Sequence, residues 1–445
     1  MARLFGTDGV RGIANQELTG DLAFRLGRAA VVALTELGEA RPEILVGRDT
    51  RASGEFLEAA LAAGICSAGG DAVLLGVATT PEVAFLTTDL GAQAGAVISA
   101  SHNPAEYNGI KFFGETGYKL ADAVEDEIEA LTVDDDGPTP TGRGLGRIRQ
   151  LDVAGERYLR HLDSVPGCSL QGMRVVVDCA NGAASALAPE ILRRHGAKVV
   201  AFSDAPDGWN INDGVGATVP EVVARAVLEH GADAGVAHDG DADRAMFADH
   251  EGRVVDGDQV LAACALDRHR RGELPGDLVV STPMANLGFH QCMRAAGIRV
   301  AEAKVGDRYV LEEMLRSGAR LGGEQSGHVI FLDHATTGDG LLTALQFLGL
   351  AVRTGTSVAE LAAGMQKFPQ SLVNVEVADR DRLDGAGPIW DGVRAAEREL
   401  GERGRVLVRT SGTEPVVRVM VEASTKEEAD RHARSIADLV AATLG

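Results

Sequence analysis

Short apolar runs alternate with amphipathic stretches along most of the chain. Ile44–Val46 is the first such run, and a helical pattern over Ser53–Ala68 separates it from a second run at Ala72–Leu75. A helix is predicted after Pro81, and a third strand is predicted near Ala96–Ser99. Strands that alternate with helices in this way predict parallel sheets built from βαβ units.

The same order of elements recurs twice along the chain. The second set predicts three strands and two helices, at Arg174–Val177, Lys198–Phe202 and Ala232–Val236, and at Ala183–Arg194 and Pro220–Glu229. The third set does the same, with strands at Leu278–Ser281, Arg299–Glu302 and Arg320–Gly322 and helices at Ala285–Ala296 and Asp307–Arg316. This repetition predicts three similar α/β domains with mainly parallel sheets, at residues 1–150, 151–255 and 256–367.

The last segment has a different pattern. Strands predominate there, at Ser371–Val377, Arg405–Arg409 and Val416–Glu422, with helices predicted at Trp390–Leu400 and Lys426–Leu444. Residues 368–445 are therefore predicted to form a small C-terminal α+β domain.

A polar, glycine-containing or proline-containing loop follows the third strand of each predicted α/β domain. The three loops begin at Ala100, His238 and Gly323. In parallel α/β sheets, ligands bind beyond the carboxyl ends of the strands. The loops are either ordinary connections or the parts of a functional site, and their matching positions favour the second interpretation.

The second loop carries three aspartates at alternate positions, Asp239, Asp241 and Asp243. Carboxylates spaced in this way can converge on one hard cation. A calcium-binding EF-hand loop would need glycine and glutamate where Arg244 and His250 stand, so that interpretation fails. The acids fit Mg²⁺, with a solvated acidic turn as the alternative. Arg244 favours a functional site, because it can hold a phosphate beside the metal.

The first loop contains Ser101, directly before His102. A serine hydroxyl at the end of a strand can act as a nucleophile or carry a phosphate. The G-x-S-x-G elbow of hydrolases is absent, and an adjacent His102 is poorly placed to be a base for the serine. A helix cap or turn serine is the alternative. Lys111 is either a proton donor and acceptor or a surface lysine.

Two further loops contain groups that bind sugars and phosphates. Glu324, Ser326 and His328 can hydrogen-bond to neighbouring sugar hydroxyls. The segment Arg409–Pro415, with Arg418 beyond it, combines hydroxyls, backbone N–H groups and arginines, so it is either a phosphate cradle or a hairpin turn. It is not a Walker A loop, since that motif is absent from the chain.

Net charge and composition limit which classes of molecule the protein is expected to bind. The chain of 445 residues has a formal net charge of −22, and no basic block stands out, so nucleic-acid binding is not expected. An anionic substrate must be held by local Arg, Lys and backbone N–H groups. The five cysteines include no Cys-x-x-Cys pair, which fits a reducing cytoplasm. No signal peptide or membrane-spanning run is present.

Taken together, the loops resemble those of the α-D-phosphohexomutase superfamily. The resemblance runs along nearly the whole chain, and it is carried by the segments Leu4–Gly12, Ile98–Pro104, Asp239–Arg244, Lys304–Arg308, Gly323–His328 and Arg409–Pro415. It implies four domains arranged around a central cleft, with one loop from each. The opening segment and Gly323–His328 resemble the branch of the superfamily that acts on glucosamine phosphates.

The resemblance also implies roles for individual residues. Ser101 would be a phosphoserine and would bind Mg²⁺ together with Asp239, Asp241 and Asp243. The implied catalytic set is Ser101, Lys111, Arg11, His102 and Arg244. The implied substrate-binding set divides between the sugar, with Glu324, Ser326 and His328, and the phosphate that is not transferred, with Arg409, Ser411, Gly412, Thr413 and Arg418.

The implied reaction converts glucosamine 6-phosphate to glucosamine 1-phosphate through a 1,6-bisphosphate, which supplies UDP-N-acetylglucosamine for cell-wall synthesis. A mutase of glucose or mannose phosphates and a non-catalytic sugar-phosphate binding protein are the alternatives. A sugar 1,6-bisphosphate as primer, an activating kinase, a homodimer and a cytoplasmic location are further expectations.

Overall fold

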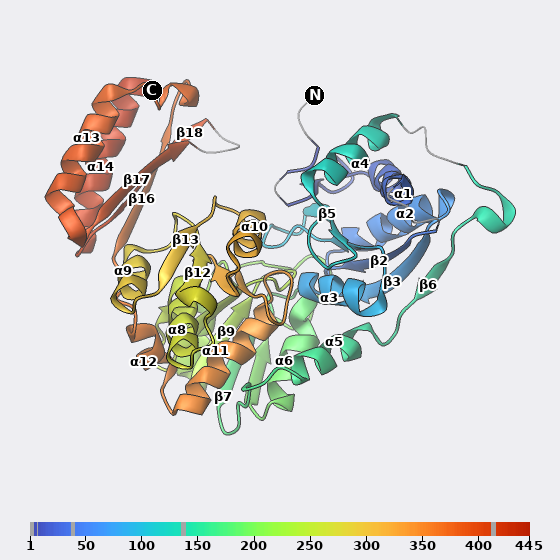
Figure 1. Cartoon of the computed structure of the whole chain (residues 1–445), viewed down its shortest axis with the longest axis horizontal. Coiled ribbons are helices and arrows are strands. Elements are labelled where there is room, and N and C mark those ends of the chain that lie inside the picture. Colours follow the sequence, from blue (N-terminus) through green and yellow to red (C-terminus); the bar gives the residue numbers. More distant parts are fainter. Residues whose placement is uncertain (1–3, 7, 37–40, 135–138, 411–414) are drawn as a thin grey trace. The chain divides into compact units, whose positions relative to one another are not determined.

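A computed structural model describes residues 4–6, 8–36, 41–134, 139–410 and 415–445. Internal contacts divide the chain into two compact units, one of Met1–Met284 and Gly297–Gly364 and the other of Ala285–Ala296 and Met365–Gly445. Three sheets lie in the first unit and one lies in the second (Figure 1). No helix in the described ranges is long and apolar enough to cross a membrane.

The first sheet has six strands, in the spatial order β1 (Val10–Ile13), β5 (Tyr107–Gly114), β4 (Ala94–Ile98), β2 (Glu43–Arg48), β3 (Asp71–Val77) and β6 (Ile148–Gln150). Strands β4, β2, β3 and β6 pair in parallel, which confirms the predicted βαβ core. Strands β5 and β1 extend the sheet in the antiparallel direction and were not predicted.

Helices cover both faces of this sheet. They are α1 (Gly20–Glu36), α2 (Ser53–Ser67), α3 (Thr80–Leu90) and α4 (Asp122–Asp134). Ile44 and Val46 of β2 belong to the hydrophobic core that contains residues of α1 and α2, whereas Leu45 belongs to the core beneath α3. Burial on both faces explains why the central strands read as continuous apolar runs instead of alternating patterns.

The second sheet has five strands, in the order β11 (Val254–Val255), β10 (Ala245–Asp249), β9 (Ala234–His238), β7 (Arg174–Asp178) and β8 (Lys198–Phe202). Its helices are α5 (Ala154–Asp163), α6 (Leu187–Arg194) and α7 (Glu221–His230). Helix α6 is shorter than predicted, because Ala183 N donates to Gly240 O at 2.8 Å and the backbone makes a short 3-10 turn there before the helix begins.

The third sheet has four strands, in the order β13 (Arg299–Glu302), β12 (Leu278–Ser281), β14 (Leu321–Gly323) and β15 (Val329–Phe331). The helices of this part of the first unit are α8 (Gly257–Arg270), α10 (Asp307–Ser317), α11 (Gly340–Thr354) and α12 (Val358–Ala363). In all three sheets the third parallel strand turns back into an antiparallel neighbour, β4 into β5, β9 into β10 and β14 into β15. The three polar loops are the turns of these hairpins.

The second unit contains an antiparallel sheet and three helices. The sheet order is β16 (Gln370–Glu376), β18 (Val416–Glu422) and β17 (Arg405–Thr410). Helices α13 (Gly387–Leu400) and α14 (Lys426–Leu444) cover one face of it (Figure 1), and α9 (Leu287–Ala295) belongs to this unit by its contacts. The predicted α+β character of the C-terminal segment is confirmed.

The start of α3 has a buried capping box that makes stability depend on pH. Glu82 N donates to Thr79 Oγ1, and Thr79 N donates to Glu82 Oε2, each at 3.2 Å. Burial raises the pKa of Glu82 from its ordinary value of 4.5 to about 8. As the pH rises from about 4.5 toward 8, the unfolded chain releases this proton and the folded chain retains it, so stability is lost across that window.

We therefore expect Glu82→Gln to weaken this loss, because the amide oxygen still accepts from Thr79 N and does not ionise. Thermal unfolding at pH 6 and pH 8 measures this loss of stability. The decrease in Tm from pH 6 to pH 8 should be smaller in the variant than in the wild type. Glu360→Gln is the matched control, since Glu360 occupies an exposed capping box with Ser357. Equal falls in the wild type and Glu82→Gln would contradict the expectation.

Candidate active site

The three hairpin loops of the first unit contact one another. Ser101 Oγ of the first loop donates to Asp239 Oδ2 of the second at 2.8 Å, and Asn212 Nδ2, in the connection after β8, donates to Ser101 O at 2.9 Å. Thr80 N donates to Asp241 O at 3.0 Å, and Ala245 N, just after the acidic loop, donates to Gly327 O at 3.1 Å. Loops that were predicted at equivalent positions in separate sheets therefore lie together.

Ser101 is buried at the centre of this cluster, with 2% of its surface exposed. Its hydroxyl donates to Asp239 Oδ2 at 2.8 Å, and its Oγ lies 3.2 Å from His102 Nδ1. Since the single hydroxyl proton goes to Asp239, the His102 ring would donate to Ser101 in this arrangement. Ser101 also has a φ of +51°, which is unusual for a residue with a side chain.

The three aspartates of the second loop form a buried cluster. One oxygen of each, from Asp239, Asp241 and Asp243, lies within 4.8 Å of the others. Burial, together with the neighbouring aspartates, raises the pKa values of Asp239 and Asp243. Within the described residues, Asp241 Oδ1 and Asp243 Oδ1 are buried without a hydrogen-bond partner. Mutually repelling carboxylates with unused oxygens fit a hard divalent cation.

Lys111 on β5 extends into the acidic cluster. Its Nζ lies 2.7 Å from Asp241 Oδ2 and 4.0 Å from Asp243 Oδ2. Burial acts to raise the pKa of Asp241, but the charge and hydrogen bond of Lys111 outweigh burial and lower that pKa. Burial likewise acts to lower the pKa of Lys111, but the surrounding carboxylates raise it. Lys111 is thus held as a cation.

His102 and Arg244 lie beside the serine and the acids, and Arg11 lies near His102. Arg11 pairs with Asp8, and Arg244 Nε lies 3.7 Å from Asp243 Oδ1 and 3.9 Å from Asp239 Oδ2. Burial, with Arg244 and Arg11 nearby, lowers the pKa of His102 to about 4, so its ring is neutral at pH 7. These cations offset the net negative charge of the protein where an anionic group would be transferred.

The third loop presents unused polar atoms. Ser326 Oγ and both ring nitrogens of His328 are buried without a hydrogen-bond partner in the described part of the chain. Glu324 is held in place by Gly306 N, which donates to its Oε1 at 3.0 Å. Gln325 turns away toward α8, where its Nε2 donates to Asp258 Oδ2 at 3.1 Å. Ser326 Oγ could therefore bind a ligand, whereas His328 Nε2 also lies 3.9 Å from Asp307 Oδ2.

The predicted phosphate loop lies in the second unit. Ser411, Gly412 and Thr413 fall outside the described residues. Arg409 and Arg418 stand directly opposite each other on β17 and β18. Burial and the charge of Arg418 lower the pKa of Arg409. Two cations that face each other on neighbouring strands would gain from a bound anion.

Sequence reasoning missed several residues that support the site. Lys119 Nζ lies 2.6 Å from a carboxylate oxygen of Asp8 and 2.6 Å from one of Asp307, which joins the first sheet to the start of α10. Thr80 Oγ1 donates to Asp241 Oδ2 at 2.6 Å. Asp307 lies in the segment Lys304–Arg308, which the resemblance had singled out without a role. Lys119 and Thr80 are common residue types, and neither belongs to a recognisable motif.

Thr80 and Lys111 both engage Oδ2 of Asp241, whereas Oδ1 is buried without a hydrogen-bond partner among the described residues. We expect Thr80→Val to lower kcat about tenfold and to raise the Mg²⁺ concentration needed for half-maximal activity, as for other groups that orient a metal ligand. A Mg²⁺ titration of activity tests this. The control is Thr87→Val on the same helix, whose hydroxyl donates to Val83 O within that helix. A similar change in both variants would exclude a specific role for Thr80.

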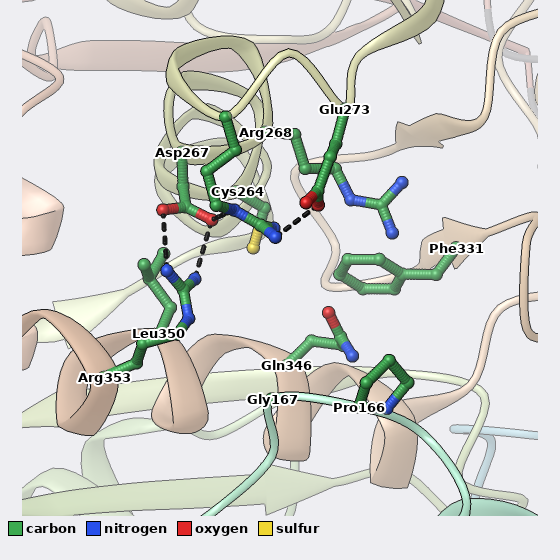
Figure 2. A pocket seen from close by; sticks show the side chains of 11 residues that line it. Pro166, Gly167, Cys264, Asp267, Arg268, Glu273, Phe331, Gln346, Leu350 and Arg353 are labelled. Carbon is green, nitrogen blue, oxygen red and sulfur yellow. Dashed lines mark hydrogen bonds and ion pairs between the residues drawn. The ribbon is translucent and has the colours of Figure 1, made fainter.

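A separate cavity of about 220 Å³ lies between α8, α11 and Pro166–Gly167 (Figure 2). Asp267 bonds to both Arg353 and Arg271, at 2.7 and 2.9 Å, and Arg268 pairs with Asp333 at 2.9 Å. The cavity is at the ends of α8 and α11, whereas the loops of the site contact the first residues of these helices. The arginines that line the cavity are all paired with carboxylates, so the cavity is a poor binding site for an anion.

Family models cover most of the chain. The α/β/α domains I, II and III of phosphoglucomutase/phosphomannomutase match residues 2–137, 156–252 and 256–368, and the C-terminal domain of the same family matches residues 372–439. A phosphoglucosamine mutase of Symbiobacterium thermophilum is 55% identical over 447 aligned positions, which span 100% of both chains.

Solved structures share the fold over the same length. A phosphoglucomutase/phosphomannomutase family protein of Burkholderia thailandensis is 26% identical, with a TM-score of 0.83 over 99% of this chain and 97% of that one. The Aspergillus fumigatus N-acetylphosphoglucosamine mutase, solved with GlcNAc-6P and magnesium, is 18% identical, with a TM-score of 0.70 over 99% of this chain and 96% of that one.

Proposed function

Because the chain belongs to the phosphoglucomutase/phosphomannomutase family, and within it to the phosphoglucosamine mutases, we propose that it interconverts glucosamine 6-phosphate and glucosamine 1-phosphate at the site around Ser101. It is an isomerase of the phosphohexomutase class. The observation that carries the proposal for the site is the buried Ser101 hydroxyl, which donates to one carboxylate of a three-aspartate cluster.

Ser101 is the proposed phosphate carrier. Phospho-Ser101 donates its phosphoryl group to the free C1 hydroxyl of glucosamine 6-phosphate, so the bond from Oγ to phosphorus breaks while the bond from the sugar oxygen forms. The 1,6-bisphosphate turns within the site and returns its 6-phosphate to Ser101. Glucosamine 1-phosphate then leaves, and the phosphoserine is restored.

A proton moves with each phosphoryl transfer: the attacking hydroxyl loses one, and the leaving oxygen takes one up. Lys111, which is held protonated, is the proposed acid, and the neutral His102 is able to accept a proton. Arg11 and Arg244 supply positive charge beside the phosphoryl group while it is transferred.

Mg²⁺ is the proposed cation of the site, held by Asp239, Asp241, Asp243 and a phosphate oxygen on Ser101. When bound, it neutralises charge on the transferring group. The unused carboxylate oxygens of the cluster support this choice, and the fungal relative contains magnesium. Removal of the ion with EDTA should abolish turnover and lower Tm, and both should return when Mg²⁺ is added in excess.

Substrate contacts are proposed for two loops. Glu324, Ser326 and His328 would bind sugar hydroxyls, which is supported by the unused polar atoms of the last two. The opposed pair Arg409 and Arg418 would bind the phosphate that is not transferred, together with Ser411, Gly412 and Thr413. The four-domain division at residues 150, 255 and 367, priming by a sugar 1,6-bisphosphate or a kinase, a homodimer and a cytoplasmic location stay predictions.

A coupled assay of purified protein tests the proposed substrate. The values of kcat/KM for glucosamine 6-phosphate, glucose 6-phosphate and mannose 6-phosphate are measured side by side, with the enzyme primed in the same way for each. The proposal expects a clear preference for glucosamine 6-phosphate. A preference for the glucose or mannose compound would overturn it, and binding without turnover would favour a non-catalytic sugar-phosphate binding protein.

A further inference from the structure

We propose that Arg51 and Asn212 form a clamp on two backbone carbonyls of the Ser101 loop and thereby position the serine for phosphoryl transfer. Arg51 Nη2 donates to Ser101 O at 2.9 Å and to Asn103 O at 2.7 Å. Asn212 Nδ2 donates to the same two oxygens, at 2.9 and 3.0 Å. The proposal rests on the proposed function, because it assumes that Ser101 carries the phosphate.

Arg51 is itself fixed from behind. Its side chain is 0% exposed, and its Nε donates to Asp49 Oδ2 at 2.8 Å. The same Asp49 oxygen accepts from Ser99 Oγ at 2.6 Å, and Ser99 Oγ accepts from Ser101 N at 2.9 Å. Hydrogen bonds thus lead from the carbonyl of Ser101 through Arg51, Asp49 and Ser99 back to the N–H of Ser101. A buried ion pair rarely makes a net contribution to stability. Because Arg51 of this pair also donates to the carbonyls of the Ser101 loop, we assign the pair a positioning role.

The clamp acts on the residue whose backbone is strained. Ser101 has a φ of +51°, in the left-handed region that residues with a Cβ avoid. Its carbonyl is pinned by two donors, which holds the peptide in this orientation and directs Oγ to Asp239 at 2.8 Å. Without the donors, the loop can relax to a negative φ, which would turn the hydroxyl away from the acidic cluster.

Asn212 connects the loop of Ser101 to the acidic loop Asp239–Asp243. It lies in the connection after β8, so its amide crosses from the second sheet to a loop of the first. A Cβ on Gly240, between Asp239 and Asp241, would lie 2.5 Å from Ser101 O and 2.9 Å from Asn212 Nδ2. Only glycine at position 240 therefore allows the Ser101 carbonyl to pack against the acidic loop Asp239–Asp243. The clamp therefore sets the separation between the phosphate carrier and the acids.

The test removes the Asn212 donor while retaining the buried ion pair. We expect Asn212→Ala to lower kcat by about 10- to 100-fold, since small misplacements of reacting groups have effects of this size. KM for glucosamine 6-phosphate should change less than about twofold, because Asn212 does not belong to the sugar or phosphate loops. Hydrogen exchange of the peptide that spans Ser99–Glu106 should accelerate. Asn212→Asp, which cannot donate, should behave in the same way if the alanine variant folds poorly.

Asn210→Ala is the matched control. Asn210 lies in the same connection, but its amide donates to Ala205 O within that connection. It should keep wild-type kcat and wild-type exchange in the serine loop. The clamp is overturned if Asn212→Ala and Asn212→Asp keep wild-type kcat, if exchange in the serine loop is unchanged, or if Asn210→Ala loses as much activity. Failure of the proposed function is a separate result, because it would appear as turnover by Ser101→Ala.

Discussion

Ser101→Ala is expected to lose mutase turnover by roughly 10⁴- to 10⁶-fold, the range found when an enzyme's covalent nucleophile is removed. The hydroxyl is the proposed acceptor and donor of the phosphoryl group. Among the described residues, the other hydroxyl that donates to the acidic cluster is that of Thr80, which is bonded to Asp241. The fold should survive, because the change removes a single oxygen, with its hydrogen bonds to Asp239 and His102. The measurements are kcat in the coupled assay and the intact mass, which should show no phosphorylation at this position.

Ser164→Ala is the control for this variant. Ser164 is the exposed residue at the end of α5, and its hydroxyl donates to His161 O. The control should retain wild-type turnover and wild-type phosphorylation of Ser101. Turnover by Ser101→Ala within tenfold of the wild type would show that the phosphate travels by another route.

Asp241→Asn is expected to have the second-largest effect, a loss in kcat of about 10³-fold, comparable to the removal of one group that stabilises charge in the transition state. The substitution removes one charge from the acidic cluster and leaves Lys111 without its partner at 2.7 Å. Loss of a buried partner should also reduce the free energy of unfolding by about 3 kcal/mol. Thermal unfolding with and without Mg²⁺ gives a readout besides activity, and the increase in Tm caused by the ion should become much smaller.

Asp249→Asn separates the loss of the cation site from the loss of a buried carboxylate. Asp249 is also buried and bonds to Arg253 Nε at 2.8 Å, but it stands at the far end of β10. Its variant should be less stable and yet keep the wild-type kcat and the wild-type response of Tm to Mg²⁺. If Asp241→Asn keeps its response to Mg²⁺, the three aspartates are not the site of the ion.

The parallel part of the fold could be predicted because it depends on local patterns. Strands β2, β7 and β12 are buried on both faces and read as apolar runs, and helices such as α2 and α10 begin and end close to their predicted positions. The antiparallel strands β5 and β10 were missed because they follow the polar loops directly, without a helix to separate them. Their position depends on pairing with β4 and β9, which is a contact between strands and not a periodicity.

The candidate site was predictable where chemistry depends on unusual residue spacing. Alternate acids in one loop and a serine at a strand end led to Asp239, Asp241 and Ser101, and the structure brings these residues together. Arg51, Thr80 and Asn212 were not predictable in the same way. They act through hydrogen bonds to carbonyls and carboxylates that are distant in sequence, and such a bond leaves no pattern near the donor.

The proposed mechanism requires that the phosphoryl group on Ser101 is the one that the sugar receives. The most direct measurement loads Ser101 with isotopically labelled phosphate, mixes the protein with unlabelled glucosamine 6-phosphate for a single turnover, and follows the label on the Ser101 peptide and on the sugar. We expect the label to leave Ser101 at least as fast as product forms, to appear in the 1,6-bisphosphate, and to end in glucosamine 1-phosphate while Ser101 carries unlabelled phosphate. Label that stays on Ser101 while glucosamine 1-phosphate accumulates would exclude phospho-Ser101 as the donor.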